Sequence, residues 1–182
     1  MRASRDETTG DHQLIDYHIK GRQLRWLKTL HIAFAAMWAG GTVCMAVVEF
    51  AYTPRLAAEM AALRTILWLV DLYVVAPSAL MCMLTGFFYS AMTTFGFLKY
   101  WWIIVKWALT LAYNLAGFLI LSPWLAHMAR ISSALPPEAL APPESALFSA
   151  ASGVLVLAQL GVVGLMIVIT IVKPWGHTRW HV

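Results

Sequence analysis

Charged residues are scarce in this sequence. Only 12% of the 182 residues are Asp, Glu, Lys or Arg, whereas 60% are hydrophobic. An ordinary soluble domain carries about 25% charged residues, so this composition excludes a typical soluble globular protein. It predicts an integral membrane protein.

Common motifs of soluble enzymes are missing as well. The chain has no Gly-rich phosphate loop, no H-E-x-x-H, no C-x-x-C and no G-x-S-x-G. Its net charge of +4 comes from basic residues that flank apolar segments instead of forming one face. Anionic lipid headgroups of the bilayer are therefore the expected partner of these residues, and nucleic acid is not.

Four apolar segments are each long enough to cross a hydrocarbon core about 30 Å thick. We place these spans at about 26–51, 65–92, 99–126 and 147–173, within a transmembrane domain of residues 24–174. Residues 1–23 and 175–182 are predicted to be polar tails, and the first lacks the apolar core of a signal peptide. A separate short helix at the membrane surface is predicted for residues 55–64.

The distribution of Lys and Arg predicts the orientation. Most of these residues lie in the two tails and in the loop between the second and third spans, whereas Arg55, Arg64 and Arg130 lie on the opposite side. Because basic residues are enriched on the cytoplasmic side, both termini are predicted to be cytoplasmic. The expected location is a bacterial inner membrane.

Each span carries one polar stripe at helical spacing. A polar residue inside a bilayer is costly and usually faces the other helices, so the stripes predict an all-α, up-down bundle of four transmembrane helices with a polar interior. Ala36 with Gly40, and Ser149 with Gly153, are predicted to allow close helix approach. The stripes are His31, Trp38, Met45 and Glu49; Asp71, Ser78, Cys82, Thr85 and Tyr89; Lys106, Thr110, Tyr113, Asn114 and Gly117; and Ser152, Gln159, Met166 and Thr170.

Counting residues from the span ends sorts these side chains by depth. One predicted cluster, near the cytoplasmic surface, contains His31, Cys82, Lys106 and Gln159. A second, near the midplane, contains Asp71 and Asn114 with Trp38 close by. Both clusters also fit structural roles, with His31 bonding a neighbouring helix, Lys106 reaching the interface, and Asp71 paired with Asn114 instead of relaying protons.

Two chemistries fit the first cluster. His31 could be the axial ligand of haem iron, with Lys106 pairing a propionate and Trp38 and Gln159 lining the macrocycle. Lys106 and Asp71 are then the candidate catalytic residues. Alternatively, His31 and Cys82 with a nearby Met would form a soft site for copper.

The segment "WLKTLHIAFAAMWAGG", residues 26–41, resembles the first span of the four-helix membrane protoporphyrinogen oxidases, with matches at Trp26, Lys28, His31, Trp38 and Gly40. "WIIVK", Trp102 to Lys106, is similar to the start of that family's third span. This resemblance implies haem b, His31 as its ligand and a functional requirement for Lys106. His31 to Gly41 also resembles the copper resistance protein D family and several uncharacterised bacterial membrane proteins.

The leading hypothesis is thus a membrane haem b-binding redox protein that acts on a tetrapyrrole or passes electrons to quinone or a protein partner. A copper transport or resistance protein is the alternative, using His31, Met37, Cys44, Met45 and the "MCM" triplet at 81–83. A non-catalytic accessory subunit of a respiratory complex is a third hypothesis. A homo-oligomer is compatible with all three.

Overall fold

The computed structural model describes residues 21–93, 96–140, 145–176 and 178, and the secondary structure within these ranges is helical. Four helices are long and apolar enough to cross a membrane. The first is α1 (Gly21–Ala51) and the fourth is α6 (Ser145–Val172). The second runs continuously through α2 (Ala57–Val70), η1 (Asp71–Val75) and α3 (Ala76–Met92), and the third through α4 (Trp101–Ala116), η2 (Gly117–Leu121) and α5 (Ser122–Ser133). The predictions of an all-helical chain and of four long apolar helices are confirmed.

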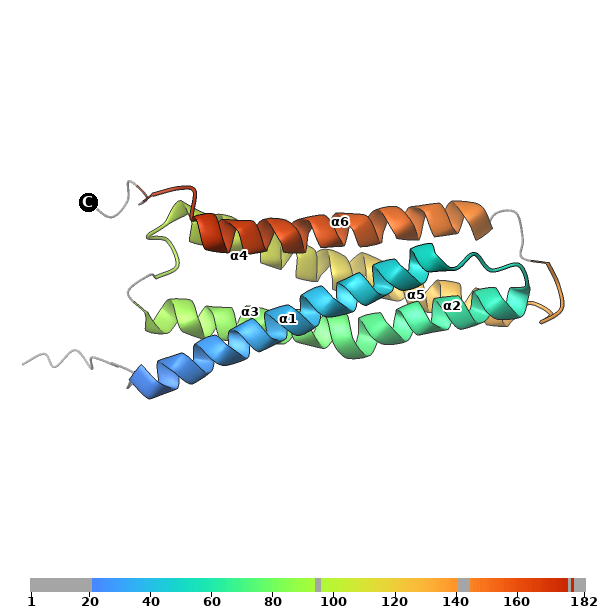
Figure 1. Cartoon of the computed structure of the whole chain (residues 1–182), viewed down its shortest axis with the longest axis horizontal. Coiled ribbons are helices and arrows are strands. Elements are labelled where there is room, and N and C mark those ends of the chain that lie inside the picture. Colours follow the sequence, from blue (N-terminus) through green and yellow to red (C-terminus); the bar gives the residue numbers. More distant parts are fainter. Residues whose placement is uncertain (1–20, 94–95, 141–144, 177, 179–182) are drawn as a thin grey trace, which may run out of the picture.

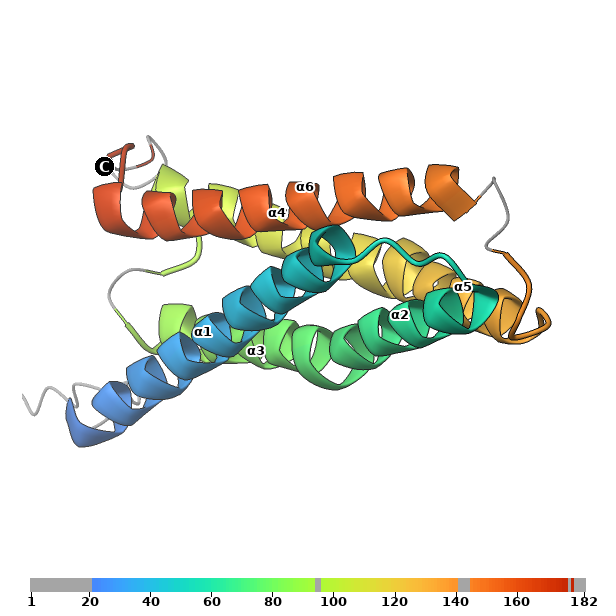
Figure 2. The same ribbon diagram turned by 45° about the vertical axis from the view of Figure 1, so that its right-hand side comes forward.

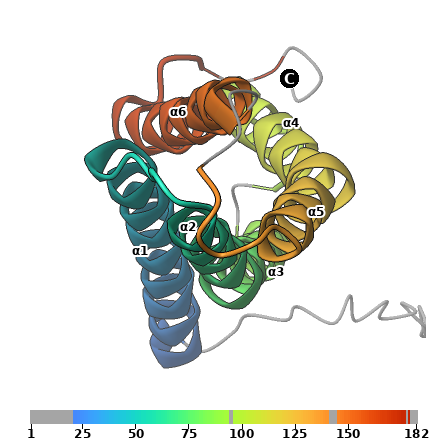
Figure 3. The ribbon, with the colours of Figure 1, turned by 90° about the vertical axis from the view of Figure 1, so that its right-hand side faces the viewer.

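The four helices lie side by side and alternate in direction along the chain (Figures 1 and 2). Viewed from one end, they surround a common centre (Figure 3). The first helix packs against the second and against α6, and the third packs against the second through α2 and α5 and against α6 through α4. Each helix therefore contacts two neighbours in a closed ring.

The observed helices differ from the predicted spans mainly at their ends. Residues 55–64 do not form a separate surface helix, because α2 begins at Ala57 and continues without a break into the second membrane-length helix. The Glu59 carboxylate accepts hydrogen bonds from the backbone N–H groups of Arg55 and Leu56, at 2.7 and 3.2 Å, and so caps the start of this helix. Of the predicted tails, residues 1–20, 177 and 179–182 lie outside the described residues.

Two π-helical turns interrupt the second and third helices at matching places. Each five-residue turn, η1 or η2, is followed by one residue and then by a proline, Pro77 or Pro123. Proline has no N–H, and its ring clashes with the carbonyl four residues earlier. A wider π turn relieves that clash while the helix continues, which is how membrane helices tolerate proline.

Backbone hydrogen bonds join the connecting segments at both ends of the bundle. At the end where α1 finishes, Ala57 N–H donates to the Ala139 carbonyl at 2.9 Å, which pairs the first and third connections. At the opposite end, Thr178 donates from its N–H to Lys99 O at 2.9 Å and from its hydroxyl to Leu98 O at 2.7 Å. These bonds satisfy backbone groups that the helices leave free.

Gly41 makes the closest approach between α1 and η1. A Cβ atom at this position would lie 2.9 Å from Val75 Cγ2 and 3.1 Å from Val74 Cγ1, whereas one on Gly40 would meet no atom within 4 Å. The small residue that allows helix contact is therefore Gly41 instead of the predicted Gly40. The predicted approach at Gly153 does occur, since its Cβ would lie 3.1 Å from the Phe50 ring.

We predict that Gly41→Ala destabilises the bundle although alanine favours a helix by about 1 kcal/mol over glycine. The added methyl group meets two β-branched valines whose side chains have little freedom to move, and such overpacking costs about 1–3 kcal/mol. The free energy of unfolding in mixed detergent micelles measures this effect.

Gly40→Ala is the matched control, because it makes the same chemical change one residue away in open space. It should leave the free energy of unfolding unchanged or raise it slightly. Equal effects of the two substitutions would show that the α1–η1 contact is looser than described.

Candidate functional site

Polar side chains form three clusters along the bundle. We name them the His31 cluster, the Asp71 cluster and the Arg64 cluster, in order from the end where α1 begins. On α1 they are marked by His31, Trp38 and Glu49, so the outer two clusters are separated by about 27 Å at 1.5 Å per residue. Members of the three clusters are His31, Cys82, Thr85, Lys106 and Thr170; Trp38, Asp71, Tyr113, Asn114 and Gln159; and Glu49, Arg64, Ser149 and Ser152.

In the His31 cluster, the imidazole of His31 is fixed by α3. Its Nδ1 lies 3.0 Å from the Cys82 carbonyl oxygen and 3.1 Å from the Thr85 hydroxyl. A carbonyl oxygen can only accept, so Nδ1 carries the proton and donates it. In the neutral imidazole, Nε2 then keeps its lone pair.

The Nε2 atom of His31 makes no hydrogen bond to the described part of the chain. It is also not one of the fully buried polar atoms, so it is open to a ligand that approaches the half-buried ring. Gly86 provides room beside this ring, because a Cβ at residue 86 would lie 3.2 Å from His31 Cε1.

Lys106 brings a cation to the same cluster from α4. Its ammonium group donates to the Thr170 hydroxyl of α6 at 2.8 Å and lies within electrostatic range of both His31 and Cys82. The structure thus brings together three of the four residues predicted for the first cluster. The fourth, Gln159, lies in the Asp71 cluster.

The Asp71 cluster surrounds a small cavity between η1, η2, α4 and α6, which Asp71, Tyr113, Asn114 and Gln159 line. The Trp38 ring packs edge to face on Tyr113, with ring centroids 4.7 Å apart, and only 3% of Trp38 is exposed. Trp38 and Gln159 therefore belong to the middle of the bundle. Asp71 and Asn114 lie at one height, as their stripes predicted.

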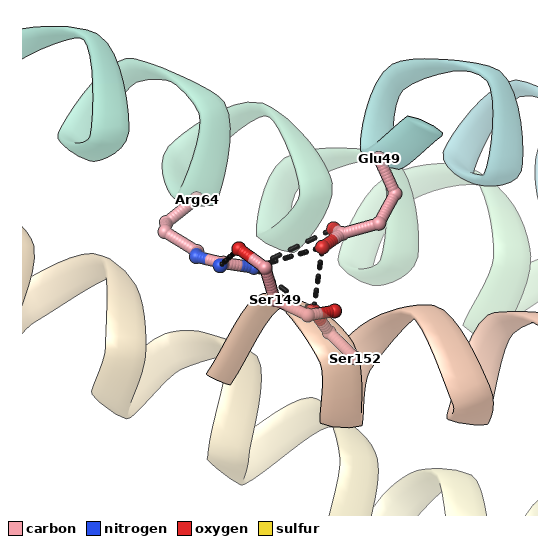
Figure 4. A network of polar contacts seen from close by, with 4 residues as sticks. All are labelled: Glu49, Arg64, Ser149 and Ser152. Atoms are coloured by element: carbon pink, nitrogen blue, oxygen red, sulfur yellow. Dashed lines mark hydrogen bonds and ion pairs between the residues drawn. The ribbon is translucent and has the colours of Figure 1, made fainter. Parts of the chain in front are cut away.

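The Arg64 cluster is the most extensively bonded (Figure 4). The guanidinium of Arg64 lies 3.4 Å from both carboxylate oxygens of Glu49 and donates to Ser152 at 3.0 Å and Ser149 at 2.7 Å. Ser152 also donates to Glu49 at 2.7 Å. The side chains of Arg64 and Glu49 are only 3% and 2% exposed, so α1, α2 and α6 are joined by a buried ion pair.

From the sequence, Arg64 is expected at the end of a surface helix outside the spans, and Ser149 is expected only to allow close helix approach. Arg64 instead lies about two turns inside α2, and its charge points into the bundle. The sequence did contain a signal for this ion pair. Glu49 lies on the polar stripe of the first span, and a buried carboxylate needs a nearby cation.

The three clusters offer few suitable ligands for a copper ion. Within the described residues, no group of three or more His, Cys, Asp or Glu could hold a metal ion. Cys82 Sγ lies 3.7 Å from His31 Nδ1, but that nitrogen already donates to a carbonyl. Cys44 is exposed while Cys82 is buried, so the two thiols occupy different surroundings.

Comparison with known proteins yields no match: neither a family model, nor a curated protein, nor a solved structure matches this chain. The functional interpretation therefore depends on the geometry of the three clusters.

We predict that Arg64→Met lowers the free energy of unfolding by about 3–5 kcal/mol, because it leaves the Glu49 carboxylate buried without a partner. The double variant Glu49→Leu with Arg64→Met should lose less than Arg64→Met alone, since no charge is then stranded. Unfolding in mixed micelles of increasing denaturing detergent measures all three proteins.

Arg55→Met serves as the control, since Arg55 is an exposed cation near the same end of the bundle. Its effect should stay within about 0.5 kcal/mol, as is usual for surface substitutions. If Arg64→Met were no more harmful than Arg55→Met, the ion pair would not stabilise the fold.

Proposed function

We propose that this chain is a haem b-binding redox protein of the bacterial inner membrane, with His31 as the iron ligand and both termini in the cytoplasm. The observation that carries the proposal is the hydrogen bond from His31 Nδ1 to the Cys82 carbonyl. Histidines that bind metals usually donate their other ring N–H to such a partner, which sets the tautomer and orients the ring.

Haem suits the His31 cluster better than a free metal ion does. The porphyrin already supplies four nitrogen ligands to its iron, so a single imidazole from the protein is sufficient. The accessible Nε2 of His31 provides that ligand. The Lys106 ammonium, held by Thr170, is the cation that would pair with a propionate.

Bound haem would supply one-electron chemistry at its iron. The protein's part is to hold the imidazole through Cys82 and Thr85, to leave space at Gly86 and to position the cation of Lys106. His127 is exposed on α5, in the other half of the bundle, and cannot serve as a second ligand at this site. Haem held by His31 alone would favour reaction with a substrate over electron transfer alone.

The resemblance of residues 26–41 to membrane protoporphyrinogen oxidases adds support from the sequence. It points to oxidation of a tetrapyrrole as the activity, with electron transfer to quinone or a protein partner as the alternative. Among the residues of that resemblance, His31 and Lys106 lie within electrostatic range of each other, although they lie on different helices.

The first test is an absorption spectrum of the full chain purified in mild detergent. We expect a Soret band that shifts on reduction, and its loss in His31→Ala because the iron ligand is gone. His127→Ala, which removes an exposed imidazole from the other half of the bundle, should leave the band intact.

Gly86→Ala provides a finer test, because its methyl group would press on His31 Cε1. We expect lower haem occupancy at unchanged protein yield, whereas Gly164→Ala, which adds a methyl group in open space, should have no effect. A wild-type protein without a Soret band, or a band that survives in His31→Ala, would contradict the proposal. Copper without iron in metal analysis would favour the copper hypothesis.

Reporter fusions test the orientation. Alkaline phosphatase fused after residue 182 should be inactive and a fluorescent protein at the same site should fluoresce, because a cytoplasmic C-terminus supports only the second. Phosphatase inserted at Glu138, in the third connection, should show the opposite behaviour. An active phosphatase at the C-terminus would reverse the proposed topology.

A further inference from the structure

Three residues that line one cavity at mid-depth in the bundle each carry a buried polar atom without a hydrogen-bond partner in the described part of the chain. These atoms are Asp71 Oδ2, Tyr113 OH and Gln159 Oε1. Asp71 and Gln159 are only 3% and 9% exposed, so bulk water does not replace the missing bonds. Native proteins leave very few buried polar groups unpaired, and several at one place indicate a ligand or an ordered water.

The cavity is small, and its lining is mostly apolar with a few polar groups. Its volume is about 20 Å³, which is room for roughly one water molecule. Asn114 donates from its side-chain amide to the Thr110 carbonyl at 2.8 Å. The polar lining residues are thus one carboxylate, one phenol and two amides, whereas the other lining residues, including Val75 and Ala79, are apolar.

The two π-helical turns meet at this cavity. Asp71 and Val75 belong to η1, and Gly117 and Phe118 belong to η2. A π turn inside an α-helix often marks a functional site. In secondary transporters, Gly- or Pro-interrupted helices at corresponding positions point to the midplane binding site.

The charge of Asp71 determines which kind of ligand the cavity can bind. In the described part of the chain, no Lys, Arg or His forms a salt bridge with Asp71, and one of its carboxylate oxygens lies within reach of the Ser122 hydroxyl. A lone carboxylate in hydrocarbon is strongly disfavoured and takes up a positive charge or a proton. A metal cation would need more oxygen ligands than these side chains provide in a space of one water molecule.

We propose that this cavity is a proton-binding site, in which the Asp71 carboxylate takes a proton from the aqueous phase and an ordered water bonds the carboxyl group to Tyr113 and Gln159. A single water can donate to the Gln159 oxygen and to one further acceptor while it accepts from the Tyr113 hydroxyl. All three unpartnered atoms are then satisfied. The site is separate from the His31 cluster and does not depend on haem.

Few other titratable groups face Asp71. Among the described residues, Tyr113 of α4 lies within electrostatic range, and the uncharged Trp38 and Thr42 of α1 lie beside its hydroxyl. On α2 the nearest charge is Arg64, seven residues or roughly 10 Å along the helix axis, and it is paired with Glu49 of α1. Cys82 on α3 and His31 on α1 belong to the His31 cluster, toward the end of the bundle where α1 begins. The residue of α6 that lines the cavity is the uncharged Gln159.

Infrared spectroscopy of the full chain in lipid nanodiscs at neutral pH tests the proposal. The wild type should show the carbonyl stretch of a protonated carboxylic acid, shifted in heavy water, and Asp71→Asn should lose it. Glu138→Gln removes an exposed carboxyl group and should leave the band unchanged. In ¹⁸O-labelled water, a bound-water band should shift in the wild type and be absent in Gln159→Leu.

If Asp71→Asn does not fold, Tyr113→Phe provides a second test of the same infrared band. Loss of the hydroxyl should move the carboxylic acid band, and an unmoved band would overturn the proposal. It would also be overturned by absence of the band in the wild type, by its persistence in folded Asp71→Asn, or by its loss on adding Na⁺ or K⁺, which would identify a cation site. Because none of these readouts uses a Soret band, failure here leaves the haem proposal untouched.

Discussion

A polar group that enters hydrocarbon must find its partners inside the protein, because lipid tails offer none. The Arg64 cluster shows this constraint most fully. One guanidinium contacts a carboxylate and two hydroxyls from three other places in the chain, so Glu49, Ser149 and Ser152 are held around it. The positions of α1, α2 and α6 at this end of the bundle depend on that single charge.

The same constraint operates at the other end with different chemistry. His31 joins α1 to α3, and Lys106 joins α4 to α6 through Thr170. The His31 cluster is less completely hydrogen-bonded than the Arg64 cluster, because His31 Nε2 has no hydrogen-bond partner among the described residues. That nitrogen and the Lys106 ammonium are the two groups on which the proposed function depends.

The middle of the bundle differs from both ends in its hydrogen bonding. There the helices are widened by η1 and η2 beside Pro77 and Pro123, and polar atoms are left without partners. A fold whose helices are held together by polar contacts toward both ends can maintain unpaired polar atoms at its centre. Residues that break local rules in this way are expected at functional positions.

Much of the architecture follows from local sequence patterns. Apolar runs of sufficient length predict four membrane helices, and polar residues at helical spacing predict which face of each helix turns inward. The polar stripes and the rise per residue together predicted that His31, Cys82 and Lys106 lie at one level, because the stripe gives the face of each helix and the rise converts sequence position into height. The count was wrong for Gln159, which lies 14 residues, or about 21 Å, from the span end predicted at residue 173 and therefore at mid-depth.

The sequence by itself determined the class of the protein, the number of long helices and the polar stripes, because these depend on composition and periodicity. Only the tertiary structure decided that Arg64 is a buried ion-pair partner, that Gly41 instead of Gly40 admits η1, and that two π turns face one cavity. Each of these depends on which helix lies opposite and at what height. Such pairings between distant segments leave no periodic signal along the chain.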